Sequence, residues 1–213
     1  MDEVGQGWIE RNRARLDPAV DALAESTSDL QAARARLLAD LREHALVIGE
    51  VTLTSGRKAA YYVDAKRAIL LSEAFAALGV LIADAARSCA ATAVGGVPVS
   101  AIPVACAALA AGFPRRAFIV RKERKEHGLQ RWIEGPEPQP GERCLLVEDV
   151  VTTGGSTIEA LERVRGEGIE IAGVACVLDR LAGGGDAIRA ALGGAPYFPL
   201  CTIDEVYPER PDR

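Results

Sequence analysis

The sequence predicts an α/β fold, a mostly parallel sheet flanked by helices, and three observations predict it. From Ser72 onward, short apolar runs alternate with segments of helical periodicity, which implies right-handed crossovers between parallel strands. One apolar run ends in two carboxylates and leads directly into a loop rich in Gly and Thr, where ligands bind in such sheets. Finally, 213 residues that are 49% hydrophobic and 26% charged are enough to bury a core.

The first part of the chain is expected to form a helix and a hairpin. Residues 1–27 carry scattered apolar positions among charges, and we interpret them as a partly ordered extension. Leucines then recur on one helical face, which predicts an amphipathic helix over 29–44. The stretch EVTLTSGRKAAYYVD, residues 50–64, predicts two strands around a Ser55-Gly56 turn.

The rest of the chain predicts alternating units joined by one long connection. Residues 122–142 are polar and contain three prolines, so we expect a long loop there. The other expected elements are helix 73–88, strand 92–95, helix 101–111, strand 117–121, strand 143–148, helix 156–167, strand 171–178 and strand 198–203.

Composition argues against several classes of function. The net charge of -5 gives no basis for binding nucleic acid through bulk charge. No apolar run reaches membrane-spanning length and the N-terminus lacks the apolar centre of a signal peptide, so we expect a cytoplasmic protein with no membrane partner. The cysteines are far apart with no CxxC pair, which argues against a metal site or a disulfide framework. They are Cys89, Cys106, Cys144, Cys176 and Cys201.

The most informative stretch is LLVEDVVTTGGST, residues 145–157. Its two glycines permit unusual backbone angles and close approach, and amides at the start of the following helix converge on one centre. Hydroxyl side chains add donors, although the lysine of a G-x-x-x-x-G-K-[ST] loop is absent. The loop is therefore a candidate phosphate cradle, formed by Thr152, Thr153, Gly154, Gly155, Ser156 and Thr157.

The adjacent carboxylates Glu148 and Asp149 suggest what accompanies the phosphate. A ribose offers two vicinal hydroxyls as hydrogen-bond donors, and carboxylates accept such bonds. A ribose 5-phosphate would therefore satisfy both the carboxylates and the loop. An ordinary strand-turn-helix with an acidic cap would explain either feature alone, but the full string favours a site.

Three segments resemble one enzyme family. VEDVVTTGGST, residues 147–157, resembles the phosphoribosyl pyrophosphate motif of type I phosphoribosyltransferases. TLTSGRKAAYYVD and RKERKEHG, at 52–64 and 121–128, are both similar to orotate phosphoribosyltransferase, and the likeness spans roughly residues 29–204. It implies the type I phosphoribosyltransferase fold over 28–213.

This resemblance also implies a division of the domain and a reaction. A small N-terminal helix-plus-hairpin hood is expected at 28–70 and the core at 71–204, with residues 1–27 outside. The family transfers ribose 5-phosphate from phosphoribosyl pyrophosphate to orotate, giving orotidine 5'-monophosphate and pyrophosphate in de novo pyrimidine (UMP) biosynthesis. Magnesium is expected to be bound through phosphoribosyl pyrophosphate and water, not directly by the protein.

By the same resemblance, catalysis is assigned to Lys125, Glu148 and Asp149. The orotate-binding residues implied are Tyr62, Val63, Thr152 and Arg180, since a planar guanidinium suits a carboxylate. The phosphoribosyl pyrophosphate-binding residues implied are Arg121, Lys122, Lys125, His127, Glu148, Asp149, Val150, Val151, Thr152, Thr153, Gly154, Gly155 and Ser156.

The basic run RKERKEHG has two interpretations. On a helix it would be a solvated, ion-paired face. Because it follows a strand and precedes a Gly/Pro-rich loop, we instead expect cations that meet the pyrophosphate as its charge develops. In the family, loop 122–142 closes over the neighbouring subunit's site, which implies a homodimer.

The sequence departs from the family at two places. Thr54 stands where some members have a lysine before the Ser-Gly-Arg turn, which leaves Arg57 or Lys58 as replacements. Val99 and Ser100 stand where some members have a Tyr-Lys pair, which leaves backbone amides and the Ser100 hydroxyl.

Two other functions are compatible with a sugar-phosphate site. The first is a phosphoribosyltransferase for another base, but purine-specific members would lack the paired TSGR and RKxxKxHG segments. The second is a non-catalytic regulator that senses phosphoribosyl pyrophosphate and binds nucleic acid, which would need a basic face. The arginines of residues 1–27 are balanced by acidic residues, so no basic stripe emerges there.

Overall fold

A computed structural model describes residues 27–52, 58–123, 132–136, 138–139 and 141–213. The chain begins with a helical and hairpin unit, the hood. It consists of helix α2 (Thr27–Asp40), a π-helical turn η1 (Leu41–Ala45), strands β1 (Leu46–Thr52) and β2 (Lys58–Val63), and the short helix α3 (Lys66–Ile69). β1 and β2 pair antiparallel in a sheet of their own.

The core is a six-stranded sheet in the order β5-β4-β3-β6-β7-β8. Adjacent strands are parallel except β5, which lies antiparallel to β4 at the edge. The strands are β3 (Ala93–Gly96), β4 (Arg116–Val120), β5 (Ile133–Glu134), β6 (Arg143–Val151), β7 (Glu170–Asp179) and β8 (Tyr197–Thr202).

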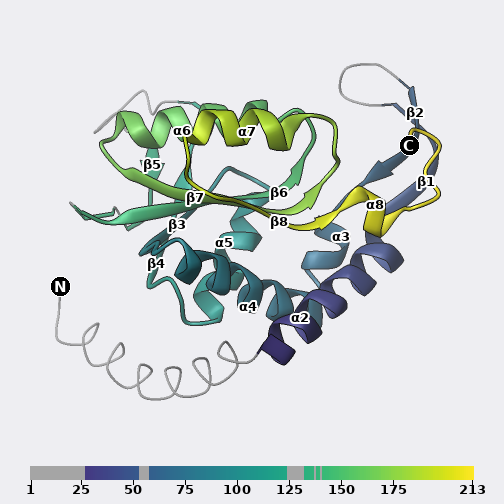
Figure 1. The fold of residues 1–213 in the computed structure, drawn as a ribbon, viewed down its shortest axis with the longest axis horizontal. Helices are drawn as coiled ribbons and strands as arrows, with labels where there is room; N and C mark the ends of the chain where they lie inside the picture. The colour runs from purple at the N-terminus through teal and green to yellow at the C-terminus, as the bar shows by residue number, and fades with distance from the viewer. Residues whose placement is uncertain (1–26, 53–57, 124–131, 137, 140) are drawn as a thin grey trace.

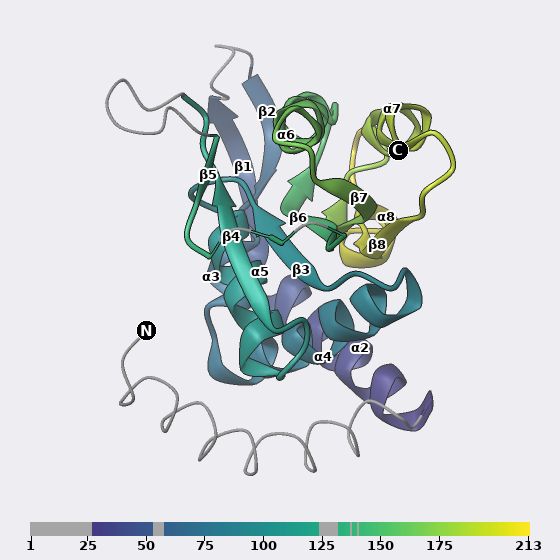
Figure 2. The same ribbon diagram turned by 90° about the vertical axis from the view of Figure 1, so that its left-hand side faces the viewer.

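Helices cover both faces of this sheet, as right-handed crossovers require. In Figure 1, α6 and α7 lie on one face and α4 and α5 on the other, with the hood at one end beside α8. Figure 2 shows α2 next to α4, on the side of the sheet away from α6. The helices are α4 (Ser72–Ser88), α5 (Ala101–Ala110), α6 (Gly155–Gly166), α7 (Gly184–Leu192) and α8 (Ile203–Val206).

Strand β6 shows how the two faces are filled. Successive side chains of a strand point to opposite faces. Leu145 and Val147 belong to the hydrophobic cluster that also contains the α4 and hood residues. Cys144 and Leu146 belong to the cluster beneath α6 and α7. Both faces are therefore buried, which explains why the predicted parallel strands appeared as near-continuous apolar runs.

The predicted α/β class and hood are confirmed. The expected helix 29–44 is α2 continued by η1, and the expected hairpin is β1 and β2, whose turn lies outside the described residues. Expected helices 73–88, 101–111 and 156–167 correspond to α4, α5 and α6.

Three expectations about the elements were wrong. Residues 122–142 are not wholly a loop, because Ile133 and Glu134 pair with β4 as β5. The strand expected at 143–148 runs on to Val151, because its register with β7 continues to Val151↔Asp179. Helices α7 and α8 were not predicted; α7 starts in a run of glycines that hides its periodicity.

No helix in the described ranges combines the length and the apolar character needed to cross a membrane.

Candidate active site

The acidic pair lies in the last part of β6. Glu148 is bonded to a hydroxyl of α6, Asp149 lies near Lys66 of the hood, and both carboxylates line one cavity. Glu148 is 6% exposed and Asp149 is 9% exposed. Both carboxylates lie inside a strand that continues to Val151, whereas the sequence placed them at its carboxyl end.

The loop after β6 turns sharply at Gly154. This residue has φ of +78°, a left-handed conformation that favours glycine. A Cβ placed there would lie 2.9 Å from the backbone oxygen of Gly184, so the position also has no room for a side chain. The turn brings the N-terminus of α6 toward the acidic pair, and such a terminus attracts anions.

The loop after β7 is hydrogen-bonded to the end of β6 and to the loop that follows it. The backbone N–H of Arg180 donates to the Val151 oxygen at 2.9 Å, and that of Gly184 donates to the Thr152 oxygen at 3.1 Å. The loop that carries Arg180 is therefore fixed to the end of β6.

A cavity of about 210 Å³ gathers part of the predicted sugar-phosphate set, namely Lys122, Glu148, Asp149, Val150 and Ser156, but is not lined by residues 151–155. It brings together the acidic pair, the first turn of α6, the loop after β3 and one cation. Its lining residues are Val97, Pro98, Val99, Ser100, Lys122, Glu148, Asp149, Val150 and Ser156. Val99 and Ser100, which depart from the family pattern, thus line the same cavity as Glu148 and Asp149.

Glu148 is surrounded by hydrogen-bond donors and by a like charge. Its Oε2 accepts from the Ser156 hydroxyl at 3.2 Å and from the Thr157 hydroxyl at 3.5 Å, and its Oε1 accepts from the Asp149 backbone N–H at 3.2 Å. Burial and the neighbouring Asp149 carboxylate raise the pKa of Glu148 to about 7. Glu148 therefore holds a proton more readily than an ordinary carboxyl group does.

Asp149 has a cation nearby. The Nζ of Lys66, in α3 of the hood, lies 4.0 Å from Asp149 Oδ2 and 2.7 Å from Asp64 Oδ1. The hydrogen bond and charge of Asp64 raise the pKa of Lys66, so the lysine stays protonated. Lys66 therefore links the hood electrostatically to the acidic pair, a contact that nothing in the local sequence around Lys66 predicts.

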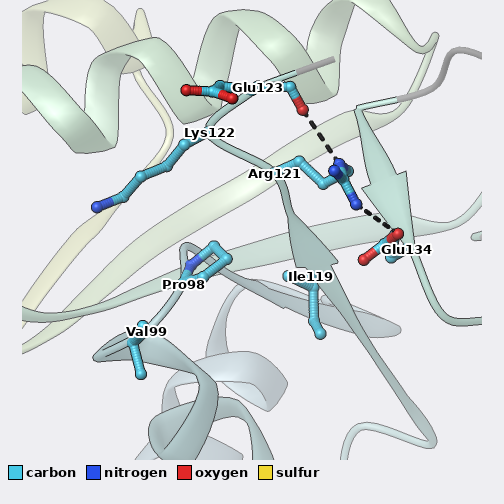
Figure 3. A pocket seen from close by; sticks show the side chains of 7 residues that line it. All are labelled: Pro98, Val99, Ile119, Arg121, Lys122, Glu123 and Glu134. Carbon is cyan, nitrogen blue, oxygen red and sulfur yellow. Dashed lines mark hydrogen bonds and ion pairs between the residues drawn. The ribbon is translucent and has the colours of Figure 1, made fainter. Parts of the chain in front are cut away.

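A second cavity, of about 350 Å³, adjoins the first on the side of β4 and β5. Figure 3 shows the Arg121 guanidinium turned toward Glu134 while the Lys122 side chain extends in the opposite direction. Arg121 Nη1 donates to Glu134 Oε1 at 2.5 Å and Nε donates to the Glu123 carbonyl at 3.1 Å. The two predicted cations are thus separated: Lys122 lines both cavities, and Arg121 is paired within the second.

The predicted base-contacting residues do not all point the same way. Tyr62 is 38% exposed, whereas Val63 is 4% exposed and packs in the core. Tyr61, which the sequence analysis did not select, faces the same side of β2 as Val63. Arg180 Nη2 donates to the Tyr61 hydroxyl at 3.0 Å, which brings Arg180 against the hood hairpin.

Several predicted residues lie outside the described part of the chain. They are Lys125 and His127 of the basic run, together with Thr54 and Arg57 of the hairpin turn. Lys58, the other suggested replacement for the family lysine, is described and pairs with Glu50 at 2.7 Å.

Within the described residues, no group of three or more His, Cys, Asp or Glu side chains could hold a metal ion. Magnesium commonly keeps several waters and binds through one or two carboxylates and substrate phosphates. Glu148 and Asp149 are two such carboxylates, and water and substrate phosphates would supply the remaining ligands.

The fold and this cavity define a phosphoribosyltransferase, and residues 74–190 match the family described as "Phosphoribosyl transferase domain". The chain is 45% identical over 175 residues to orotate phosphoribosyltransferase of Corynebacterium glutamicum (strain R), covering 82% of this chain and 94% of that protein. For the Streptomyces avermitilis protein of the same name, identity is 47% over 177 residues, with coverage of 81% and 96%. This chain therefore belongs to the orotate phosphoribosyltransferase family.

Solved structures agree with this assignment. Mycobacterium tuberculosis H37Rv orotate phosphoribosyltransferase in complex with Fe(III) dicitrate gives a TM-score of 0.73 at 43% identity, covering 82% of this chain and 99% of that chain. The structure of the same enzyme in complex with 5-phospho-alpha-D-ribosyl 1-diphosphate gives 0.69 at 38% identity, covering 82% and 98%.

The raised pKa of Glu148 predicts a dependence of stability on pH. Between the ordinary carboxyl pKa and about 7, the folded state retains a proton that the unfolded state has lost, so stability falls as pH rises through this window. Replacing Glu148 by Gln should flatten this part of the curve. The measurement is the free energy of unfolding in urea from pH 5 to pH 8, with the exposed Glu162→Gln as the matched control. If the slope of the unfolding free energy against pH is the same in Glu148→Gln as in the wild type, Glu148 is not the source of this pH dependence.

Proposed function

We propose that this protein catalyses the transfer of ribose 5-phosphate from phosphoribosyl pyrophosphate to orotate, giving orotidine 5'-monophosphate and pyrophosphate, as a step of pyrimidine biosynthesis. The observation that carries the proposal is the cavity in which Glu148 and Asp149 meet the first turn of α6 and the cation Lys122. One ligand with vicinal hydroxyls and phosphates would use all of these groups.

The sugar phosphate is assigned to the end of β6 and the start of α6. In this proposal, Glu148 and Asp149 accept hydrogen bonds from the ribose hydroxyls, while the 5'-phosphate lies on the amides and hydroxyls of residues 152–156. Asp149 also faces the positive charge that develops on the ribose ring as the pyrophosphate leaves. Fixed charges of this kind stabilise a transition state without reorganisation.

Cations are assigned to the leaving pyrophosphate. The proposed groups are Lys122, at the border of both cavities, with Arg121, Lys125 and His127 of the same basic segment. Magnesium, carried by phosphoribosyl pyrophosphate and water, would supply further neutralisation of the pyrophosphate charge. Two carboxylates are too few to enclose the ion, which supports binding through the substrate phosphates and water.

Orotate is assigned to the space between the hairpin and the loop after β7. Arg180 would pair with the orotate carboxylate, with Tyr62 and Thr152 as further contacts and Val63, whose side chain packs in the core, contributing through its backbone. The contact between Arg180 and Tyr61 supports this location, because it holds the guanidinium at the boundary between hood and core.

We further propose that residues 28–213 form the catalytic domain, with the hood at 28–70, the core at 71–204 and residues 1–27 as an extension. The separate sheet formed by β1 and β2 supports a distinct hood. The active unit is proposed to be a homodimer in which loop 122–142 completes the neighbouring site. We also propose a cytoplasmic location.

The direct test of this function is loss of orotate absorbance when the full chain is mixed with phosphoribosyl pyrophosphate and magnesium. Pyrophosphate should appear in equal amount. Absence of both changes would reject the proposal and favour a sensor of phosphoribosyl pyrophosphate.

Substrate choice tests the role of Arg180. Uracil lacks the carboxylate of orotate, so a guanidinium placed to bind that group would be left without its partner. Sites built around such polar contacts reject the analogue by about 10⁴ or more. The measurement is kcat/KM for the two bases. Comparable values would contradict the orotate assignment and favour another base.

Mixed dimers test the shared site. Lys125→Ala and Asp149→Asn should each be nearly inactive alone. If Lys125 acts on the partner's site, each mixed dimer contains one doubly altered site and one intact site. Random exchange makes about half of the dimers mixed, so activity should recover to about a quarter of wild type. No recovery, despite demonstrated exchange of subunits, would show that Lys125 serves its own chain.

A further inference from the structure

Arg180 is fixed at both of its ends. Its backbone N–H is bonded to the Val151 oxygen at the end of β6. Its guanidinium reaches the hood, where Nη2 donates to the Tyr61 hydroxyl at 3.0 Å and the guanidinium carbon lies 5.1 Å from the centre of the Tyr61 ring. The side chain therefore spans from the sugar-phosphate motif to β2.

Tyr61 is itself held rigidly. It is 3% exposed, and its ring meets the ring of Tyr207 edge to face, with centroids 5.3 Å apart and an interplanar angle of 84°. Its hydroxyl lies 3.1 Å from each carboxylate oxygen of Asp212. Burial raises the pKa of Tyr61, so the hydroxyl keeps its proton at neutral pH.

These contacts fix the direction of the hydrogen bonds. A tyrosine hydroxyl has one proton to donate, and a carboxylate can only accept. The proton therefore points to Asp212, and the hydroxyl oxygen accepts from Arg180. A bond to an ionised acceptor polarises the hydroxyl and strengthens the bond that its oxygen accepts.

The C-terminal segment completes the chain of contacts. Arg210 Nε lies 3.2 Å from Asp212 Oδ1, and Arg210 also pairs with Asp204 of α8. The Arg210 side chain is 10% exposed, so this pairing is anchored in the body of the protein. The C-terminal segment therefore contacts both the ring of Tyr61, through Tyr207, and its hydroxyl, through Asp212.

We propose that Tyr61 is a positioning residue for recognition of the orotate carboxylate, and that Asp212 acts through it. This inference rests on the proposed function, in which Arg180 binds that carboxylate. An arginine side chain has many rotamers, and ordering it on binding costs affinity. Because Tyr61 orders the Arg180 side chain before orotate binds, much of that cost is already met. The contact uses one of the five guanidinium N–H groups, so the others remain to donate to the substrate.

Tyr61→Phe is the principal test, because it removes the hydroxyl and keeps the ring in the core. The KM for orotate should rise about tenfold, as expected for loss of one hydrogen bond to a charged group. The KM for phosphoribosyl pyrophosphate and kcat should change by less than about twofold, since neither depends on the guanidinium orientation. Tyr207→Phe, which removes a hydroxyl from the same ring pair, is the matched control and should leave all three constants unchanged.

Two outcomes would overturn the inference. One is an unchanged KM for orotate in Tyr61→Phe. The other is a rise in both KM values together with a fall in kcat, which would show that Tyr61 has only a structural role. A wild-type chain that does not convert orotate would instead reject the proposed function, so the two failures are distinguishable.

A double variant tests the link to the C-terminal segment. Asp212→Ala should raise the KM for orotate by a smaller factor than Tyr61→Phe, because the hydroxyl remains. Combining the two should give no more than the effect of Tyr61→Phe alone, since residues acting through one contact are not additive. If the two increases in the KM for orotate multiply in the double variant, Asp212 acts independently of Tyr61, which would contradict that part of the proposal.

Discussion

The site depends on two adjacent carboxylates held inside a buried strand. Removing a charge from water is costly, and two like charges at neighbouring positions repel each other. Different groups meet the two carboxylates: Glu148 accepts from the hydroxyls of Ser156 and Thr157, and Asp149 lies near Lys66. Burial and the neighbouring Asp149 charge raise the pKa of Glu148. A ligand that brings hydroxyl donors would therefore stabilise the ionised form of this carboxyl group.

The loop after β7 connects this pair to the rest of the site. Its backbone is bonded to Val151 and Thr152, directly beyond the carboxylates, while the Arg180 side chain contacts Tyr61 of the hood. The sugar-phosphate motif and the proposed base pocket thus share one rigid support. Catalysis by positioning requires such fixed geometry, since the reacting atoms of sugar and base must be aligned within a fraction of an ångström.

Sequence reasoning succeeded where the determining interactions are local. The acidic pair, the glycine turn and the start of α6 are contiguous, so their pattern was visible. β5 is two residues long and exists only through its pairing with β4, and α7 begins among glycines that obscure its helical period. Tyr61 and Arg180 are 119 residues apart, and no pattern along the chain joins them. What escaped prediction was therefore set by tertiary packing.

The central claim is that Glu148 and Asp149 recognise the vicinal hydroxyls of a ribose. It is tested most directly by calorimetric titration of the wild-type protein with ribose 5-phosphate and with 2-deoxyribose 5-phosphate. These ligands share the phosphate and differ by one hydroxyl, so the account predicts that the ribose form binds about tenfold or more tightly, as for a hydrogen bond to a charged group. The preference should disappear in the double variant Glu148→Gln/Asp149→Asn. Equal affinity of the wild-type protein for both sugars would contradict the account.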